Sequence, residues 1–407
     1  MTASSVLWLH SHFMLPAGGT KFVYEVVSRL AQRRPVEVMV DQASLLWRER
    51  YAEAGVTLHE TGTTTSTLYW AGLPAAVAYD TRKVRAAAAR ADTLVSSFFP
   101  MPHVAGKVAA EQGKRHVSLC FEPFPLFHDA EFVGMYPRAK QVLLAFLRTA
   151  YGRYDMQGIR SADALLTLNE STKAQMAAVY GRDDAVCTYA GVDTELFRPY
   201  TAEETAHLRE RTVPTDDEGA GPLVVHSTDF SPIKRTDLAI EAFAVAAAEV
   251  PDARLAITST REDPPVWNDL QRRAERLGVR DRIVYLGFLP YEDLPRLYSL
   301  ADVLLQTGTS VVAGATTMSL PVKEALACQT PVVRSGATGE DVVDGVSGFL
   351  VDPNDSATTG ARLAEILGDP RRARAMGAAG RERIMATYVW DAVVDVVEQA
   401  LDSRTGR

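Results

Sequence analysis

The sequence has few cysteines and no excess of positive charge. Its 407 residues include three cysteines, Cys120, Cys187 and Cys328, which lie far apart in apolar surroundings. Their odd number and wide spacing argue against a disulfide framework or a zinc site, and favour reduced thiols in a cytoplasmic protein. The formal net charge of -8 argues against a broad basic face, so we expect no nucleic acid as a partner.

Long hydrophobic runs are also missing. The first nine residues have no basic segment, and neither a signal peptide nor a membrane-spanning helix is evident. We therefore expect a cytoplasmic protein. Hydrophobic residues make up 47% of the chain and charged residues 23%, a composition typical of globular proteins. A chain of this length is expected to form two domains, each with its own core.

Short apolar runs alternate with longer amphipathic stretches along the whole chain, which predicts α/β domains with doubly wound parallel sheets. In the first Rossmann-like domain, Gly18 and Gly19 are expected in a turn between the first strand and a helix over 20–32. The polar stretch 201–222 reads as a linker. The expected strands of this domain are Val6–His10, Val36–Val40, 93–96, 116–120, 164–168 and 186–189.

A second alternating series predicts another Rossmann-like sheet. Its expected strands are 223–226, 254–258, 283–286, Val303–Gln306 and 331–333, and its expected helices are 237–249, 266–277, Leu294–Leu300 and 320–327. The stretch 370–402 is strongly helical, and an apolar stripe that includes Trp390 suggests packing on the first domain. The predicted division is 1–200, 201–385 and a C-terminal segment 386–407. Two facing domains of this kind leave a cleft between the carboxyl ends of their sheets.

One helix of the second domain has the features of a phosphate site. It is expected to begin near Ser319, after a loop rich in Gly, Ser and Thr. Its unpaired backbone N–H groups and positive dipole end suit a diphosphate. Glu324, one turn into the helix, could accept hydrogen bonds from a ribose diol. On this pattern alone, an exposed helix residue after an ordinary connection is an equal alternative.

Several segments in order along the chain resemble the retaining glycosyltransferases of family four, which have the two-domain GT-B architecture. Gly18 and Gly19 resemble the glycine loop of that family. The other matching segments are SADALLTLNEST and YAGVDTELFRP within 160–199, TDFSPIKRTD at 228–237, LGFLPYEDLPRLYSLAD at 286–302, and DGVSGFLVDP at 344–353.

The resemblance implies transfer of a sugar from a nucleoside-diphosphate donor to a small-molecule or apolar acceptor, with retention and without a required metal or cofactor. It places Lys234 on the donor phosphate, as a catalytic and donor-binding residue. It makes Glu324 the second glutamate of the Glu-x7-Glu pattern, which holds the ribose. The resemblance also assigns Leu289, in the segment 286–302, to the donor site, together with Gly18 and Gly19. Lys234 has the alternative of an ordinary surface lysine.

The sugar-contacting half of the Glu-x7-Glu pattern is changed. Thr316 stands where the family has its first glutamate, so a neutral hydroxyl is expected to line the sugar pocket. Alternatively, the loop 308–317 has a different arrangement from that of the family. The backbone N–H groups of Met318, Ser319 and Leu320 would meet the sugar and the diphosphate, a role that tolerates changes of side chain.

Two further positions depart from the family pattern. Asp229 stands where many members have an arginine that binds the diphosphate; Arg334 is a candidate replacement, with an exposed arginine as the equal alternative. Phe121 stands where related enzymes have a histidine. Glu122 beside it could contact the acceptor or donor sugar as a catalytic residue, or could be a turn carboxylate.

Aromatic residues gather in the expected loops of the first domain. They favour core packing, with a flat apolar acceptor pocket as the alternative. The helix expected over 139–154 mixes apolar and basic residues, which suggests weak peripheral membrane contact. The competing functions are a catalytically silent donor-binding or scaffold protein, a lipid-directed glycosyltransferase, and a GT-B epimerase or phosphorylase. The aromatic residues are Tyr69, Trp70, Phe98, Phe99, Phe121, Phe124, Phe127, Phe132 and Tyr136.

Overall fold

The chain forms two compact units in the computed structural model. Unit 1 comprises Met1–Gly191 and Trp390–Arg407, and unit 2 comprises Val192–Val389. The sequence predicts boundaries at 200 and 386, so the structure moves them to 191 and 390. The structure describes residues 4–14, 18–63, 69–70, 72–212, 221–308, 320–336 and 340–403.

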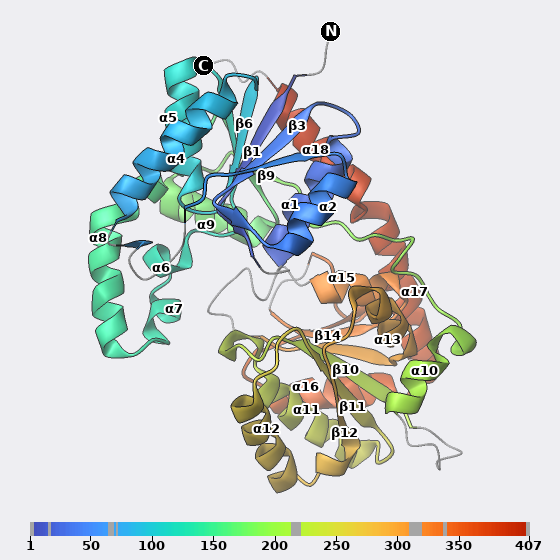
Figure 1. Ribbon diagram of the computed structural model, residues 1–407. Helices are drawn as coiled ribbons and strands as arrows, with labels where there is room; N and C mark the ends of the chain where they lie inside the picture. Colours follow the sequence, from blue (N-terminus) through green and yellow to red (C-terminus); the bar gives the residue numbers. More distant parts are fainter. Residues whose placement is uncertain are drawn as a thin grey trace. The chain divides into compact units, whose positions relative to one another are not determined.

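Unit 1 is built on a seven-stranded parallel sheet with the order β5-β3-β1-β6-β7-β8-β9 (Figure 1). Helices cover both faces, so β1 and β6 are buried along their whole length. A small two-stranded sheet, β2 (His12–Phe13) with β4 (Gln42–Ala43), extends the unit. The main strands are β1 (Val6–His10), β3 (Val36–Val40), β5 (Thr57–Glu60), β6 (Thr93–Ser97), β7 (Arg115–Leu119), β8 (Ala164–Thr167) and β9 (Val186–Cys187).

The helices of unit 1 include α1, which begins at Gly18. Gly18 and Gly19 therefore form the first turn of a helix, and their expected place in the preceding turn is wrong. The apolar residues of α1 recur at helical spacing and are buried against the sheet. The helices are α1 (Gly18–Leu30), α2 (Leu45–Glu53), α4 (Leu73–Ala88), α5 (Met101–Gln112), α6 (Pro125–His128), α7 (Ala130–Gly134), α8 (Arg138–Arg160), α9 (Glu170–Tyr180) and α18 (Trp390–Asp402).

The C-terminal helix α18 belongs to unit 1 and packs against α1. Arg33 Nη1 lies 2.8 Å from Glu398 Oε2, and Arg34 Nη2 lies 2.8 Å from Asp402 Oδ2. A Cβ atom on Gly191 would lie only 2.6 Å from the Trp390 ring, so the chain approaches the start of α18 where only glycine fits. Within the described residues, no helix is both long enough and apolar enough to cross a membrane.

Unit 2 is built on a six-stranded parallel sheet with the order β12-β11-β10-β13-β14-β15. Its apolar core includes Val224, Leu255, Val303 and Phe243, all completely buried. The crossover at β10 and β13 makes the carboxyl ends of these two central strands the expected ligand edge. The strands are β10 (Leu223–Thr228), β11 (Arg254–Ser259), β12 (Ile283–Gly287), β13 (Val303–Gln306), β14 (Val332–Ser335) and β15 (Gly348–Val351).

Unit 2 begins with a helix that the sequence does not predict. Part of the expected linker 201–222 is the helix α10. Thr201 Oγ1 accepts from the Glu204 N–H at 3.3 Å, and Glu204 Oε2 accepts from the Thr201 N–H at 2.8 Å, which is a capping box. The helices are α10 (Ala202–Thr212), η1 (Pro232–Lys234), α11 (Thr236–Glu249), α12 (Pro264–Arg276), η2 (Arg280–Arg282), η3 (Tyr291–Asp293), α13 (Leu294–Leu300), α15 (Leu320–Ala327), α16 (Ser356–Leu367) and α17 (Pro370–Thr387).

Candidate functional site

In unit 2, a strained turn after β10 carries Lys234. The turn enters the short helix η1 and leaves it into α11. Two residues that are not glycine have left-handed backbones here: Phe230 with φ 57° and Arg235 with φ 45°. Such conformations cost about 1–3 kcal/mol each and persist where the surrounding structure imposes them, often at functional sites.

The strand β13 holds this turn in place. Thr307 Oγ1, just after β13, donates at 2.8 Å to the Lys234 carbonyl and lies 3.0 Å from the Arg235 carbonyl. The Arg235 guanidinium is engaged by Asp237, with Nε 3.1 Å from Oδ1. In the part of the chain that the structure describes, no carboxylate pairs with the half-buried Lys234 ammonium. The backbone of Lys234 is therefore held in place, and its ammonium group is available to an anionic ligand.

The unexpected acid in this turn, Asp229, is occupied by the turn itself. Its Oδ1 accepts from the Ser231 N–H at 2.8 Å and from the Ser231 hydroxyl at 2.5 Å. A carboxylate that closes its own turn is a common device in loops. The turn thus has an acid where the family that the sequence resembles often has an arginine, and this acid stabilises the turn.

A buried polar network supports the turn from below. His226, at the centre of the sheet, has Nδ1 2.9 Å from the Leu305 carbonyl and Nε2 3.2 Å from Thr236 Oγ1. Thr236 Oγ1 also lies 2.8 Å from Thr228 Oγ1. Burial lowers the pKa of His226 to about 4, so this imidazole is neutral at physiological pH. The network joins β10, β13 and the start of α11, and so fixes both sides of the Lys234 turn.

Glu324 is buried and held by a tyrosine. It is 4% exposed, and Tyr291 Oη, in η3 after β12, donates to its Oε1 at 3.0 Å. The Tyr291 ring packs on Phe197, with ring centroids 5.2 Å apart. The alternative of an exposed helix residue is therefore wrong. A carboxylate fixed one turn inside α15 is suited to the predicted ribose contact, which stays a prediction.

The other predicted donor residues lie partly outside the described residues. Thr316, Met318 and Ser319 fall in that category, so their predicted roles stay predictions. Leu320 is described and is the first residue of α15, a position consistent with its predicted backbone role. Leu289, two residues after β12, is buried with 5% exposure, and its contact with a donor also stays a prediction.

Arg334 does not have the surroundings that the sequence suggests. Its side chain is 1% exposed, and Nη1 lies 2.5 Å from Oδ1 of the equally buried Asp341. The alternative of an exposed arginine is wrong. The diphosphate role conflicts with this pairing, because the guanidinium would have to leave a buried carboxylate to reach a ligand. The sequence pattern did not reveal the pair, since Asp341 lies seven residues further along the chain and outside β14.

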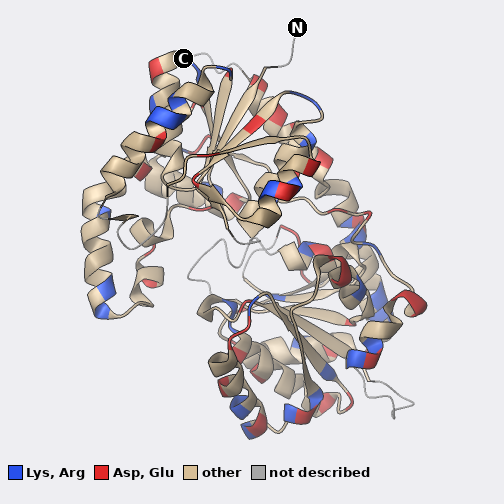
Figure 2. Ribbon diagram, in the orientation of Figure 1, with Lys and Arg blue, Asp and Glu red and all other residues tan. Residues whose placement is uncertain are grey.

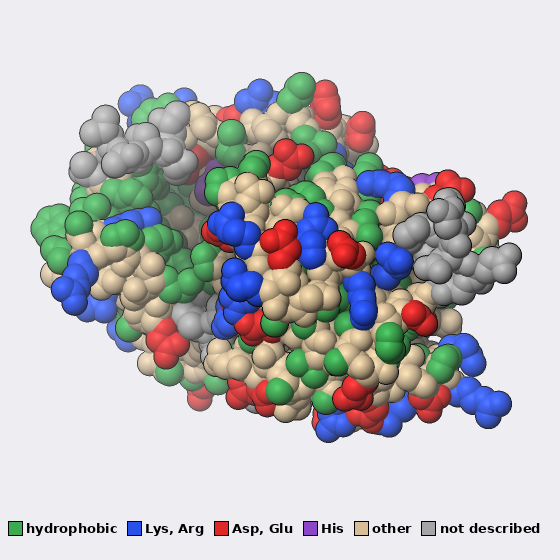
Figure 3. All heavy atoms as spheres, turned by 90° about the horizontal axis from the view of Figure 1, so that it is seen from below, with side chains coloured by type: hydrophobic (Ala, Val, Ile, Leu, Met, Phe, Trp, Pro, Cys, Tyr) green, Lys and Arg blue, Asp and Glu red, His purple; other side chains and the backbone are tan. Residues whose placement is uncertain are grey.

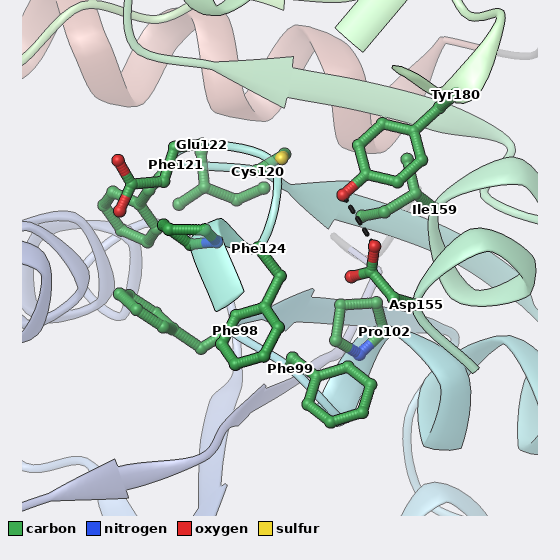
Figure 4. A pocket seen from close by; sticks show the side chains of 12 residues that line it. Phe98, Phe99, Pro102, Cys120, Phe121, Glu122, Phe124, Asp155, Ile159 and Tyr180 are labelled. Atoms are coloured by element: carbon green, nitrogen blue, oxygen red, sulfur yellow. Dashed lines mark hydrogen bonds between the residues drawn. The ribbon is translucent and has the colours of Figure 1, made fainter. Parts of the chain in front are cut away.

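In unit 1, Glu122 lines a cavity of about 80 Å³ after β7 (Figure 4). Burial, with a smaller effect from Asp129, raises the pKa of Glu122 to about 7. A carboxyl group whose pKa is raised by burial in a cavity is a candidate functional group. The predicted contact of Glu122 with the acceptor or the sugar stays a prediction. The lining residues are Phe98, Phe99, Pro102, Leu119, Cys120, Phe121, Glu122, Phe124, Pro125, Asp155, Ile159 and Tyr180.

The opposite side of this cavity has a hydrogen-bonded group that the sequence did not single out. Asp155 Oδ2 accepts from the Tyr180 hydroxyl at 2.8 Å and lies 2.7 Å from His128 Nε2. Asp155 is on α8, Tyr180 on α9 and His128 on α6, so three helices supply it. The only signal in the sequence is an acid on the apolar side of a helix, and the distance along the chain concealed its partners.

Phe98 and Phe121 pack around the start of α1. A Cβ atom on Gly19 would lie 3.0 Å from the Phe98 ring and 3.8 Å from the Phe121 ring. The backbone of Phe98 is left-handed, with φ 63°. Phe121, which replaces the family histidine, thus forms an aromatic wall with Phe98, and the two ring centroids are 5.1 Å apart. The aromatic residues after β6 and β7 line a cavity, and several also pack against the buried cluster around Phe127, so core packing is confirmed for these. That the cavity takes an acceptor stays a prediction.

Metal binding has no support from the described side chains. Across the described ranges, no group of three or more His, Cys, Asp or Glu residues could hold a metal ion. The expected independence from metals and cofactors stays a prediction.

Comparison with known proteins connects unit 2 to one family. Residues 214–383 match the family "Glycosyl transferases group 1". A GDP-mannose-dependent alpha-(1-6)-phosphatidylinositol monomannoside mannosyltransferase of Mycolicibacterium smegmatis is 34% identical over 253 residues, which cover 61% of this chain and 63% of that protein. A D-inositol 3-phosphate glycosyltransferase of Xylanimonas cellulosilytica is 31% identical over 263 residues, 62% of this chain and 60% of its own. The match thus spans less than two thirds of either relative.

Solved structures share the fold over nearly the whole chain. The Anabaena protein HepE, crystallised with UDP and glucose, has a TM-score of 0.74 at 16% identity and covers 98% of this chain and 100% of its own. WaaG, a glycosyltransferase involved in lipopolysaccharide biosynthesis, has a TM-score of 0.73 at 16% identity with the same coverage. The fold is GT-B, with two Rossmann-like domains.

Proposed function

We propose that this chain, which carries a group 1 glycosyl transferase domain on a GT-B fold, moves a hexosyl group from a nucleoside-diphosphate sugar to a small-molecule acceptor with retention. The observation that carries the proposal is the Lys234 turn. The turn contains two left-handed residues, and the Thr307 hydroxyl, shared between the Lys234 and Arg235 carbonyls, holds it at the carboxyl edge of the unit 2 sheet. No described carboxylate neutralises the lysine.

The departing diphosphate is the group that unit 2 would stabilise. As the bond to the sugar breaks, negative charge grows on the phosphate oxygens, and a fixed ammonium lowers the energy of that state more than that of the bound donor. Glu324, already held by Tyr291, would accept hydrogen bonds from the ribose hydroxyls. The donor phosphate would itself take the acceptor proton, so the proposal needs no separate general base.

Unit 1 would hold the acceptor. Its carboxyl edge carries Glu122 and the aromatic cavity, which suit an acceptor group with an apolar face. In this proposal Glu122 hydrogen-bonds the acceptor or the transferred sugar. The cytoplasmic location also remains part of the proposal.

The test is a panel of GDP-, UDP-, ADP- and dTDP-sugars incubated with the protein and a small-molecule extract. We expect nucleoside diphosphate to be released only when an acceptor is present, with an α-linked product from an α-linked donor. The names of the relatives make GDP-mannose the first donor to try. Donor binding without turnover for every pair would instead support the catalytically silent alternative.

A lipid-directed glycosyltransferase is the second candidate, because α8 exposes large apolar side chains beside basic ones. Val142 is 72%, Leu143 52% and Phe146 65% exposed. The exposed charges of the helix are basic, as the bands along α8 show (Figure 2). Viewed from below, hydrophobic and basic side chains lie together on the side where Figure 1 places the lower end of α8 (Figure 3). Such a surface suits an anionic bilayer.

Vesicle flotation separates the two candidates. If the acceptor is a lipid, the protein should float with vesicles that contain anionic lipid and not with purely zwitterionic ones. The double variant Val142→Ser, Phe146→Ser should lose flotation and turnover of a lipid acceptor. Leu45→Ser, which changes a 67% exposed leucine on α2, is the matched control.

A further inference from the structure

The cavity of unit 1 combines aromatic rings with carboxylates and offers nothing to an anion. Two of its lining side chains are acids, Glu122 and Asp155. Among the described residues that line it, none is Lys, Arg, His, Asn or Gln, and its one hydroxyl, that of Tyr180, donates to Asp155. Its aromatic faces, which have negative electrostatic potential, come from Phe98, Phe99, Phe121 and Phe124.

The two acids have different surroundings. Asp155 is 5% exposed, and His128 and Tyr180 both contact its Oδ2. No described side chain donates to the Glu122 carboxylate. Glu122 and Phe121 lie on one side of the cavity, and Asp155 and Tyr180 on the other (Figure 4). The cavity is therefore lined by two acids, and one of these has no cationic partner in the described structure.

The aromatic walls are held rigidly by their neighbours. The Phe99 and Phe124 rings stack with centroids 5.1 Å apart, and the Trp70 ring stacks on both at 6.2 Å. Phe98 has a left-handed backbone and packs against Gly19. Because these rings are already ordered, little side-chain entropy would be lost when a ligand binds.

We propose that this cavity binds an organic ammonium group, with the charge between Glu122 and Asp155 and the substituents against the phenylalanine rings. Cations bind the faces of aromatic rings, and the effect is larger where water is excluded. A buried carboxylate without a partner gains most from a cationic ligand, because the ligand replaces the lost hydration. A phosphate would meet two acids and no donor. On the proposed function, this ammonium group belongs to the sugar acceptor.

A pair of isosteric probes tests the charge directly. Choline and its neutral carbon analogue 3,3-dimethylbutan-1-ol have nearly the same shape and differ in charge. Calorimetric titration of each into the protein, without donor, should show choline binding at least about tenfold more tightly. Quenching of Trp70 fluorescence gives a second readout, which Trp70→Phe should abolish. Equal binding of the two probes, or no choline binding, would overturn the proposal.

Two variants locate the binding in the cavity. Glu122→Gln keeps the shape and removes the charge, so it should weaken choline binding about fivefold to tenfold and leave the neutral probe unchanged. Phe99→Leu should weaken choline binding with Glu122 intact. The matched control is Glu131→Gln, which removes an exposed acid from the neighbouring helix α7. Loss of choline binding in the control as well would show that net charge, and not the cavity, is responsible.

These readouts do not depend on turnover. If no sugar transfer is found but choline binds as expected, the cation site stands and the proposed acceptor role fails. If transfer is found with neutral or anionic acceptors while choline does not bind, the cation site fails and the proposed function stands. Nucleoside-diphosphate binding, measured on each variant, reports whether unit 2 is still folded.

Discussion

The two units have the same kind of sheet and opposite chemistry at its carboxyl edge. In unit 2 this edge has a lysine, Lys234, and the acid of the same turn, Asp229, accepts hydrogen bonds from Ser231 within that turn. In unit 1 the edge has two acids and four phenylalanines around a cavity. Parallel sheets place the ends of several strands together whatever their sequence, so the fold supplies the place and the loop residues decide which ligand is bound.

The largest expected effect is the loss of activity when Lys234, at the carboxyl edge of the unit 2 sheet, is replaced. Lys234→Ala should lower kcat/KM for sugar transfer roughly 100- to 1000-fold, because the charge that develops on the leaving diphosphate loses its fixed counter-charge. Arg235→Ala is the matched control, since the adjacent guanidinium is already paired with Asp237. Steady-state kinetics with the donor found in the panel give the measurement. Similar losses in both variants would mean that the turn, and not the Lys234 charge, matters.

The second prediction asks whether Arg334 belongs to the same edge. Asp341→Asn should lower the free energy of unfolding by about 3–5 kcal/mol, because it removes the negative charge that faces the buried Arg334 guanidinium. Urea denaturation gives the measurement. Asp293→Asn, which breaks the half-exposed pair with Arg296, should cost less than about 1 kcal/mol. If Arg334→Met weakens donor binding without changing stability, the diphosphate role should be restored.

The third prediction separates the ribose from the phosphate. Glu324→Ala should weaken nucleoside-diphosphate binding roughly 10- to 100-fold, since hydrogen bonds to a charged group are lost. Binding of inorganic pyrophosphate, which has no ribose, should change little. Tyr291→Phe removes only the hydroxyl that holds Glu324 and should have a smaller effect. Calorimetry with both ligands gives the measurement, and an equal loss for pyrophosphate would contradict the ribose role.

The smallest expected effect is the pH dependence of choline binding, which follows from the protonation of Glu122 in unit 1. The pKa of Glu122 is raised to about 7 by burial and by Asp129, so the carboxyl is mostly protonated at pH 6 and mostly charged at pH 8. Choline binding should therefore strengthen several-fold between these values, by the relation between charge state and pH. Asp155, on α8, lines the same cavity, and its Oδ2 lies 2.7 Å from His128 Nε2 on α6. The pH dependence should disappear in Glu122→Gln, and an unchanged pH profile in this variant would contradict the role of Glu122.

The sequence predicted most strands of both main sheets. It also predicted the ligand-binding edge of the unit 2 sheet. The strands Val6–His10, Val36–Val40 and Val303–Gln306 agree with the structure residue for residue, because short runs that are mostly apolar are typical of strands buried in a parallel sheet. The helix α10 was missed, although the pattern Thr201-x-x-Glu204 is a capping-box signal. The polar composition of this stretch is typical of a linker, and the prediction followed the composition and not the capping-box pattern.

The sequence by itself determined the α/β class, the turn with Lys234 and the acid at 324, because strands, turns and helix starts depend on residues that are neighbours along the chain. Only the tertiary structure showed that Arg334 is paired with Asp341 and that Asp155 joins Tyr180 and His128 beside the aromatic cavity. These side chains come from separate elements. Their charge and hydrogen bonding depend on the groups that packing brings within about 3 Å, and local patterns do not contain that information.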